Sequence, residues 1–113
     1  MDETHLHILW TSADPVTAEK MVLMYATNSL LQGWWQEVTV ILWGAAARVP
    51  VDHPLVAEKM RLAAHAGVQF SACRACAEQL GVAEALDALG VEVVYWGPRL
   101  TELLRTHAPL LTV

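Results

Sequence analysis

A regular alternation of short apolar runs with helical segments is the feature that most constrains how this chain can fold. The apolar runs have the length and the β-branched and aromatic content of buried strands, and they occupy residues 5–10, 37–44, 68–72, 91–97 and 108–113. Chains that alternate in this way form a mainly parallel sheet with helices on both faces, because each connection crosses back over the sheet. We therefore predict an α/β fold with three layers, α/β/α, around a mainly parallel five-stranded sheet of the flavodoxin or Rossmann type.

The helical segments carry recognisable start signals. Asp14 followed by Pro15 predicts a helix over residues 15–32, because a capping carboxylate and a proline at the first helical position are typical of helix N-termini. Asp52 is predicted to cap a second helix that reaches about residue 65. The stretches CRACAEQLG and VAEALDALG each predict a short helix, and Pro98 is expected to open the last one.

Length and composition place this sequence in the class of single globular domains. It has 113 residues, of which 55% are hydrophobic and 17% are charged, so we predict one domain over residues 1–113. The hydrophobic share exceeds what a small monomer needs, and monomers rarely leave large apolar patches in water. We therefore expect an oligomer.

The charge and the first residues argue against several classes of protein. A formal net charge of −5 does not suit nucleic-acid binding, which needs a basic surface. The opening MDETHLHILW lacks the order of basic, apolar and small residues that marks a signal peptide. No apolar run approaches the ~20 residues of a membrane span. We expect a cytoplasmic protein with no membrane or nucleic-acid partner.

Distinctive side chains gather near the carboxyl ends of the predicted strands, where ligands bind in open parallel sheets. Tryptophan is expected at the last position of three strands, arginine follows three strands, and a polar turn with Ser12 follows the first. The residues concerned are Trp10, Trp43, Trp96, Arg48, Arg74 and Arg99. Core or interface packing of the tryptophans and solvation of the arginines are open alternatives. A guanidinium cluster would favour an anionic substrate and a thiolate.

The two cysteines, Cys73 and Cys76, form one C-x-x-C within FSACRACAEQLG. A zinc site needs more ligands, and the five histidines show no pair at the usual spacing, so we predict no metal. A thioredoxin-like redox pair fits the strand-to-helix setting but not the position in the chain. Two small buried apolar residues are another alternative. The favoured interpretation is a reactive Cys73 at a helix start, with Cys76 one turn along the same face.

The stretches VQFSACRACAEQLGV and VEVVYWGPRLTELL, together with the first strand and LWGAAA, resemble the DsrE/DsrF-like sulfur-carrier family. The resemblance covers essentially the whole chain. It implies a DsrE-like subunit in a homotrimer or homohexamer, and sulfur transfer through a persulfide on a cysteine in the third strand-to-helix turn. Cys73 matches that cysteine, and Cys76 is assigned a supporting role.

These observations predict an intracellular sulfur carrier or sulfurtransferase that needs no cofactor. The Cys73 thiolate would accept sulfane sulfur from a donor and pass it to an acceptor, both of which could be proteins. Arg74, with Arg48 and Arg99, would hold an anionic donor, and the tryptophans would exclude water. Two alternatives stay open. One is a thiol–disulfide redox or sensing module that uses Cys73 and Cys76, and the other is a non-catalytic oligomeric protein that binds a small anion.

Overall fold

The computed structural model describes residues 4–113 and has the predicted alternation of strands and helices. Its elements are β1 (His5–Trp10), α1 (Pro15–Thr17), the π-helical η1 (Ala18–Leu23), α2 (Met24–Leu31), β2 (Glu37–Leu42), the 3₁₀ turn η2 (Gly44–Arg48), α3 (Val49–Asp52), α4 (Pro54–His65), β3 (Gln69–Cys73), α5 (Arg74–Gln79), α6 (Ala83–Ala88), β4 (Glu92–Val94), α7 (Trp96–Arg105) and β5 (Leu110–Thr112). Within the described residues, no helix is long and apolar enough to cross a membrane.

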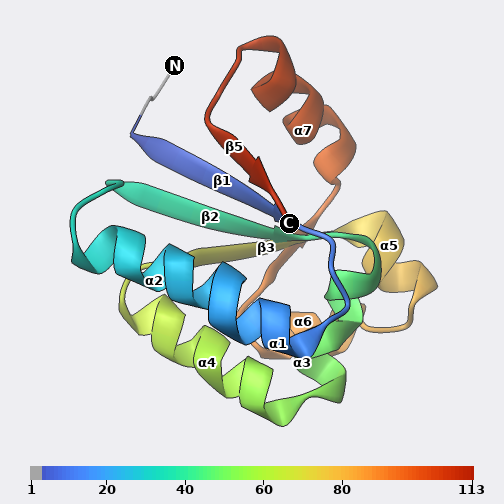
Figure 1. Cartoon of the computed structure of the whole chain (residues 1–113). Coiled ribbons are helices and arrows are strands. Elements are labelled where there is room, and N and C mark those ends of the chain that lie inside the picture. Colours follow the sequence, from blue (N-terminus) through green and yellow to red (C-terminus); the bar gives the residue numbers. More distant parts are fainter. Residues whose placement is uncertain (1–3) are drawn as a thin grey trace.

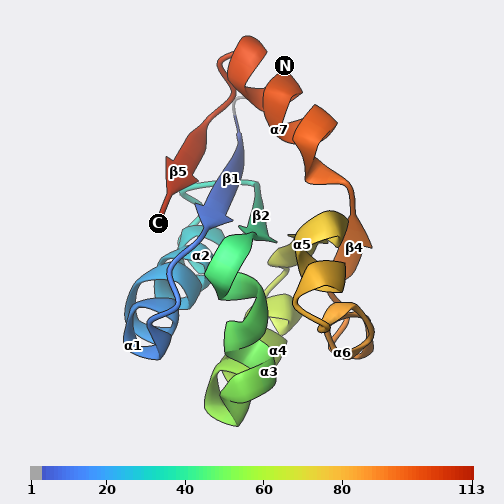
Figure 2. The same ribbon diagram turned by 90° about the vertical axis from the view of Figure 1, so that its right-hand side faces the viewer.

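The five strands form one parallel sheet in the order β4-β3-β2-β1-β5 (Figure 1). The steps from β1 to β4 all run in one direction across the sheet, so right-handed crossovers place α2, α4 and α6 on the same face. The chain then returns from β4 to the far edge, and that crossover carries α7 to the opposite face (Figure 2). The predicted three-layer α/β/α fold is confirmed, with one helix forming the third layer.

Alternation along the strands decides which side chains enter the main core. In β1 every second residue is buried, and these residues pack with β2 and β3 side chains under α2 and α4. The main core includes Ile8, Trp10, Val40, Leu42 and Ala72. The intervening residues lie on the side of α7. We call this side the α7 face and define it by His5, His7, Thr39, Ile41, Ser71 and Cys73.

The first predicted helix is confirmed as one helical run from α1 through η1 to α2. The Asp14 carboxylate accepts the backbone N–H of Val16 at 3.2 Å and the Thr17 hydroxyl at 2.8 Å. These two hydrogen bonds, that of Thr17 first, hold the pKa of Asp14 below its ordinary value. The side-chain cap therefore stabilises the helix start with its carboxylate ionised.

Two predicted helix starts were wrong by one or two residues. His53, and not Asp52, is the N-cap of α4, because Pro54 disfavours a helical conformation at the residue before it and His53 is extended. Asp52 instead ends α3. The last helix begins at Trp96 and not at Pro98, since a proline is tolerated within the first turn of a helix.

Candidate functional site

The carboxyl edge of the sheet brings together the segments that follow β2 and β3 (Figure 2). A cavity of about 500 Å³ opens there between η2, α3 and α5. Its lining comes from the segments that follow β1, β2 and β3, which lie apart in the sequence and meet because these strands are neighbours in the sheet. The described residues that line it are Ala13, Gly44, Ala45, Arg48, Val49, Asp52, His53, Cys76, Gln79 and Leu80.

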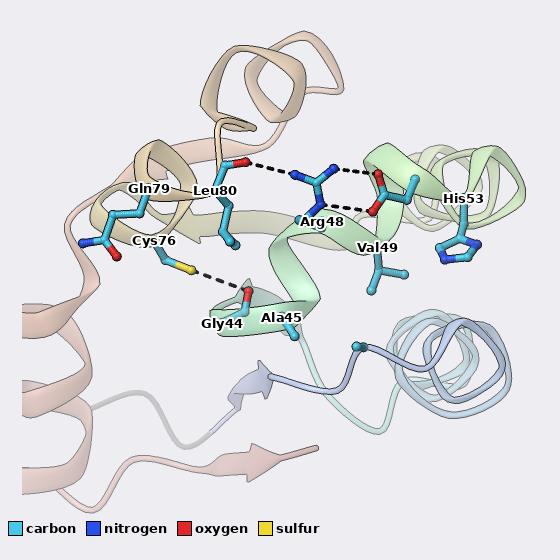
Figure 3. Close-up of a pocket in the computed structure, with 10 residues that line it drawn as sticks. Gly44, Ala45, Arg48, Val49, His53, Cys76, Gln79 and Leu80 are labelled. Carbon is cyan, nitrogen blue, oxygen red and sulfur yellow. Dashed lines mark hydrogen bonds and ion pairs between the residues drawn. The ribbon is translucent and has the colours of Figure 1, made fainter.

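Cys76 is the cysteine that reaches this cavity (Figure 3). Its thiol donates a hydrogen bond to the backbone carbonyl of Gly44, with 3.5 Å between sulfur and oxygen. Gly44 has a φ of +66°, in the left-handed region that glycine adopts without the clash of a Cβ. The left-handed turn after β2 therefore holds the carbonyl that orients the Cys76 side chain.

Cys73 is placed differently. It is the last residue of β3 and the N-cap of α5, as the predicted strand-to-helix turn requires, but its side chain is only 4% exposed. It lies on the α7 face in a small cluster with Ile41 and Trp96, and Cys76 packs against that cluster from the cavity side. Both cysteines are free thiols. Cys76 therefore lines the cavity and packs against the cluster that holds the buried Cys73.

The three predicted arginines do not gather into one cluster. Arg74 is the first residue of α5, and its guanidinium donates to the Val93 carbonyl of β4. It also lies 3.9 Å from the carboxylate of Glu78, one turn further along the helix. Arg99 lies on the other side of the sheet, 3.1 Å from the Glu92 carboxylate. Their positions are set by partners in β4 and α5, which strand order alone does not disclose.

Arg48 is the arginine that lines the cavity, and each nitrogen of its guanidinium donates one hydrogen bond within the protein (Figure 3). Its Nε and Nη2 donate to the two carboxylate oxygens of Asp52 at 3.1 and 3.0 Å, and its Nη1 donates to the Leu80 carbonyl at 3.0 Å. This two-point geometry is the strong form of an arginine–carboxylate pair. It joins η2 to α3 and α5 and places a neutral ion pair in the cavity wall.

The tryptophans and Ser12 have structural partners. Trp10 is fully buried in the main core, and its indole N–H donates to the Ser12 carbonyl at 3.0 Å. The Ser12 hydroxyl accepts the Asp14 backbone N–H at 3.2 Å, so it shapes the turn before α1. Trp96 belongs to the Cys73 cluster, and Trp43 packs against it. The prediction that these two end their strands was wrong, because β2 stops at Leu42 and β4 at Val94.

The α7 face carries a polar network that the sequence analysis missed. The Trp96 indole N–H donates to the Ser71 hydroxyl at 2.6 Å, and that hydroxyl donates to the Glu92 carbonyl at 3.0 Å. Further along the sheet, His5 and Thr39 are joined by a 2.8 Å hydrogen bond. The available signal was the alternation in HLHILW, which places both histidines of β1 on one face.

His7 lies at the centre of the α7 face. Its ring stacks on His5 with 4.1 Å between centroids and meets the Trp96 ring edge-on at 6.1 Å. Burial, and secondly the nearby His5, lower the pKa of His7 from 6.5 to about 4. Within residues 4–113 no group of three His, Cys, Asp or Glu side chains is arranged to hold a metal ion.

Comparison with known proteins identifies the family. The model of the DsrE/DsrF-like family matches residues 7–106, and the chain belongs to that family. The resemblance noted from the C-x-x-C region is therefore confirmed. No curated protein gives a significant match.

One solved structure is similar along almost its whole length. It is described as the "Structure of Conserved Protein of Unknown Function BT1422 from Bacteroides thetaiotaomicron". It shares 35% sequence identity with this chain at a TM-score of 0.94, and the match covers 97% of this chain and 95% of that one. The DsrE-like fold is thus shown by structure as well as by sequence, and a sulfur relay is the broad role that the family suggests.

Proposed function

We propose that this protein is a sulfur carrier that holds sulfane sulfur as a persulfide on Cys73. The family supports a role in sulfur relay. The observation that carries the proposal is the placement of Cys73 at the carboxyl edge of the sheet, where it is buried in a cluster with Ile41 and Trp96. A second thiol, that of the cavity-lining Cys76, packs against this cluster.

The burial of Cys73 suits storage. A persulfide is lost when another thiol attacks it or when an oxidant reaches it, and both reactions depend on access to the sulfur. A side chain that is 4% exposed, between an aliphatic residue and an indole ring, is shielded from both. Transfer requires a route by which another molecule can reach the sulfur on Cys73. Cys76 packs against the same cluster and lines the cavity, so it forms the accessible end of such a route.

The two alternative functions have different support. A thiol–disulfide module is favoured by the two free thiols at the N-cap and third positions of α5, whose side chains approach each other in helix N-termini. A small-anion binding protein is supported less well, because each of the three arginines predicted to bind the anion lies beside a carboxylate. The persulfide experiment separates the first alternative from the proposal.

Intact-protein mass spectrometry after treatment of the reduced protein with excess inorganic polysulfide tests the proposal. We expect the wild type to gain about 32 Da, one sulfur atom, that survives a brief wash with excess small thiol. Cys73→Ser should lose its gain in that wash, because Cys76 is open to the cavity. Because Arg74 lies between the two cysteines, trypsin separates them, and alkylation before digestion reports which one carries the sulfur. Retention of sulfur by Cys73→Ser at the wild-type level would refute the storage role. A loss of about 2 Da without any gain would favour the disulfide module.

A further inference from the structure

The cavity beside Cys76 has a composition that restricts what can occupy it. Its lining surface is mainly apolar, and five of its ten described lining residues are small or apolar: Ala13, Gly44, Ala45, Val49 and Leu80. Its volume of about 500 Å³ falls in the range of small-molecule sites. A site of this size and lining suits a small organic molecule with an apolar body.

The charge of the cavity wall is balanced. Among the described lining residues, Arg48 and Asp52 are the two with a permanent charge, and they neutralise each other through two hydrogen bonds. The remaining guanidinium contact goes to the Leu80 carbonyl. The pair is about half exposed, so an anion that entered would have to compete with the Asp52 carboxylate for Arg48 and lose part of its hydration against the apolar remainder of the wall. An uncharged molecule meets neither penalty.

The order of the two thiols gives the cavity a chemical role. A molecule in the cavity contacts the side chain of Cys76, whereas Cys73 lies outside the set of described lining residues and is 4% exposed. Cys76 also packs against the cluster that contains Cys73. Sulfur that arrives through the cavity therefore meets Cys76 first, and the cluster against which Cys76 packs holds the second thiol acceptor.

On the basis of the sulfur-carrier function proposed above, we infer that Cys76 is the entry thiol and that the cavity takes a low-molecular-weight persulfide with an uncharged, mainly apolar body. The Cys76 thiolate attacks the outer sulfur of the donor R–S–SH, and the donor S–S bond breaks. R–S⁻ leaves and takes up the proton that Cys76 gave up, so the products are a Cys76 persulfide and R–SH. A second exchange of the same kind moves the outer sulfur to Cys73 and restores the Cys76 thiol. No oxidant or reductant is consumed.

Alkylation tests the cavity without depending on sulfur transfer. Iodoacetamide and iodoacetate differ mainly by one negative charge. We expect iodoacetamide to modify Cys76 before Cys73. The ratio of the iodoacetamide rate to the iodoacetate rate should be at least about tenfold higher at Cys76 than for free N-acetylcysteine, because the cavity disfavours a carboxylate.

Two variants test whether the reagent reaches Cys76 through the cavity. Ala45→Phe fills the cavity from an exposed lining position and should slow Cys76 alkylation at least about fivefold through steric exclusion. Ala64→Phe, at an exposed position of α4 outside this lining, is the matched control and should leave the rate unchanged.

Sulfur transfer is then measured with benzyl persulfide, generated in the assay, and with glutathione persulfide as the charged donor. We expect Cys76→Ser to slow the arrival of sulfur on Cys73 from benzyl persulfide at least about tenfold, because the entry thiol is missing. Arrival on Cys73 at the wild-type rate in Cys76→Ser would overturn the inference and leave the sulfur-carrier proposal intact. Two alkylation results would also overturn it. One is faster labelling of Cys73 than of Cys76, and the other is the same iodoacetamide-to-iodoacetate rate ratio for Cys76 as for N-acetylcysteine. Normal alkylation with no sulfur on Cys73 from any donor would instead refute the carrier function on which the transfer step rests.

Discussion

The guanidinium of Arg48 and the carboxylate of Asp52 face each other through two hydrogen bonds, at 3.1 and 3.0 Å, in the wall of the cavity that Cys76 lines. The two residues are one helical turn apart, and this pairing was not foreseen because Asp52 was expected to cap a helix. The pair cancels the one guanidinium charge that the described residues bring to the cavity wall. An arginine beside a cysteine is therefore not, by itself, a site for an anion.

Removal of the Asp52 charge should change the selectivity of the cavity. In Asp52→Asn the Arg48 guanidinium keeps its hydrogen bond to Leu80 but loses its counter-charge, so an anionic reagent gains an attractive partner. We expect the preference of Cys76 for iodoacetamide over iodoacetate to fall about fivefold to tenfold at low ionic strength, and to recover partly at high salt.

Glu78→Gln is the matched control for this change. It removes the same charge from the chain, but Glu78 lies beside Arg74 and outside the described cavity lining. The reagent preference of Glu78→Gln should stay at the wild-type value. An equal shift in both variants would mean that net charge, and not the Arg48–Asp52 pair, controls access to Cys76.

Gly44 should resist substitution because of its backbone conformation. A Cβ at this position would meet no atom within 4 Å, so the cost of Gly44→Ala comes from the φ of +66° alone. We expect a loss of about 1–2 kcal/mol in the free energy of unfolding, measured by urea titration. Gly97→Ala is the control, because Gly97 lies in α7 without a left-handed φ and an added Cβ there is also free of contacts. It should be neutral or slightly stabilising. Similar losses in both variants would contradict the conformational argument.

The fold could be predicted from the sequence because its signals are local. The alternating apolar residues of β1 determine which face of the strand is buried. The pair Asp14 and Pro15 likewise determines where α1 begins, and neither signal depends on distant parts of the chain. The position of Cys73 at the end of β3 is equally local, since the strand and the helix that flank it are adjacent in sequence.

The arrangement of the site could be predicted only in part, because it depends on partners distant in sequence. Arg74 follows β3 as expected, yet its guanidinium is taken by the carbonyl of Val93, which becomes a neighbour only when β4 joins the sheet. The Cys76 thiol likewise finds its acceptor, the Gly44 carbonyl, in the left-handed turn that follows the neighbouring strand. Strand order indicates which loops share an edge, but not which way each side chain turns there.

The hydrogen bond between the Trp96 indole and the Ser71 hydroxyl should contribute measurably to stability. Both side chains are buried, so neither can exchange its partner freely for water. We expect Trp96→Phe to lower the free energy of unfolding by about 1–3 kcal/mol, from the lost hydrogen bond and the smaller ring. A double-mutant cycle with Ser71→Ala should give a coupling energy of about 1 kcal/mol. Additive losses would show that the indole acts through packing alone.

The stability of the protein should fall as the pH is lowered from 7 to 4, with His7 as one cause. Because the pKa of His7 is depressed from 6.5 to about 4, the unfolded chain binds a proton in this window that the folded chain excludes. The contribution of the neutral ring is complete above about pH 7 and is lost progressively as the pH falls toward 4. Each unit of depression corresponds to about 1.4 kcal/mol, and solvent screening of this partly buried ring reduces the total, so we expect a loss of about 1–2 kcal/mol.

Urea titrations at a series of pH values measure this loss, with two variants that separate His7 from the other titrating groups. His7→Gln replaces the ring with a side chain that stays neutral. The unfolding free energy of this variant should therefore fall less between pH 7 and 4 than that of the wild type, by the loss of about 1–2 kcal/mol assigned to His7. His65→Gln, at an exposed position at the end of α4, is the control for the removal of a histidine as such, and its slope should exceed that of His7→Gln. The stacked His5 adds a second test, because its positive charge disfavours a proton on His7. Its replacement by glutamine should therefore raise the pKa of His7 and flatten the slope in part. Equal slopes in the wild type and His7→Gln would mean that His7 titrates alike in the folded and unfolded chains.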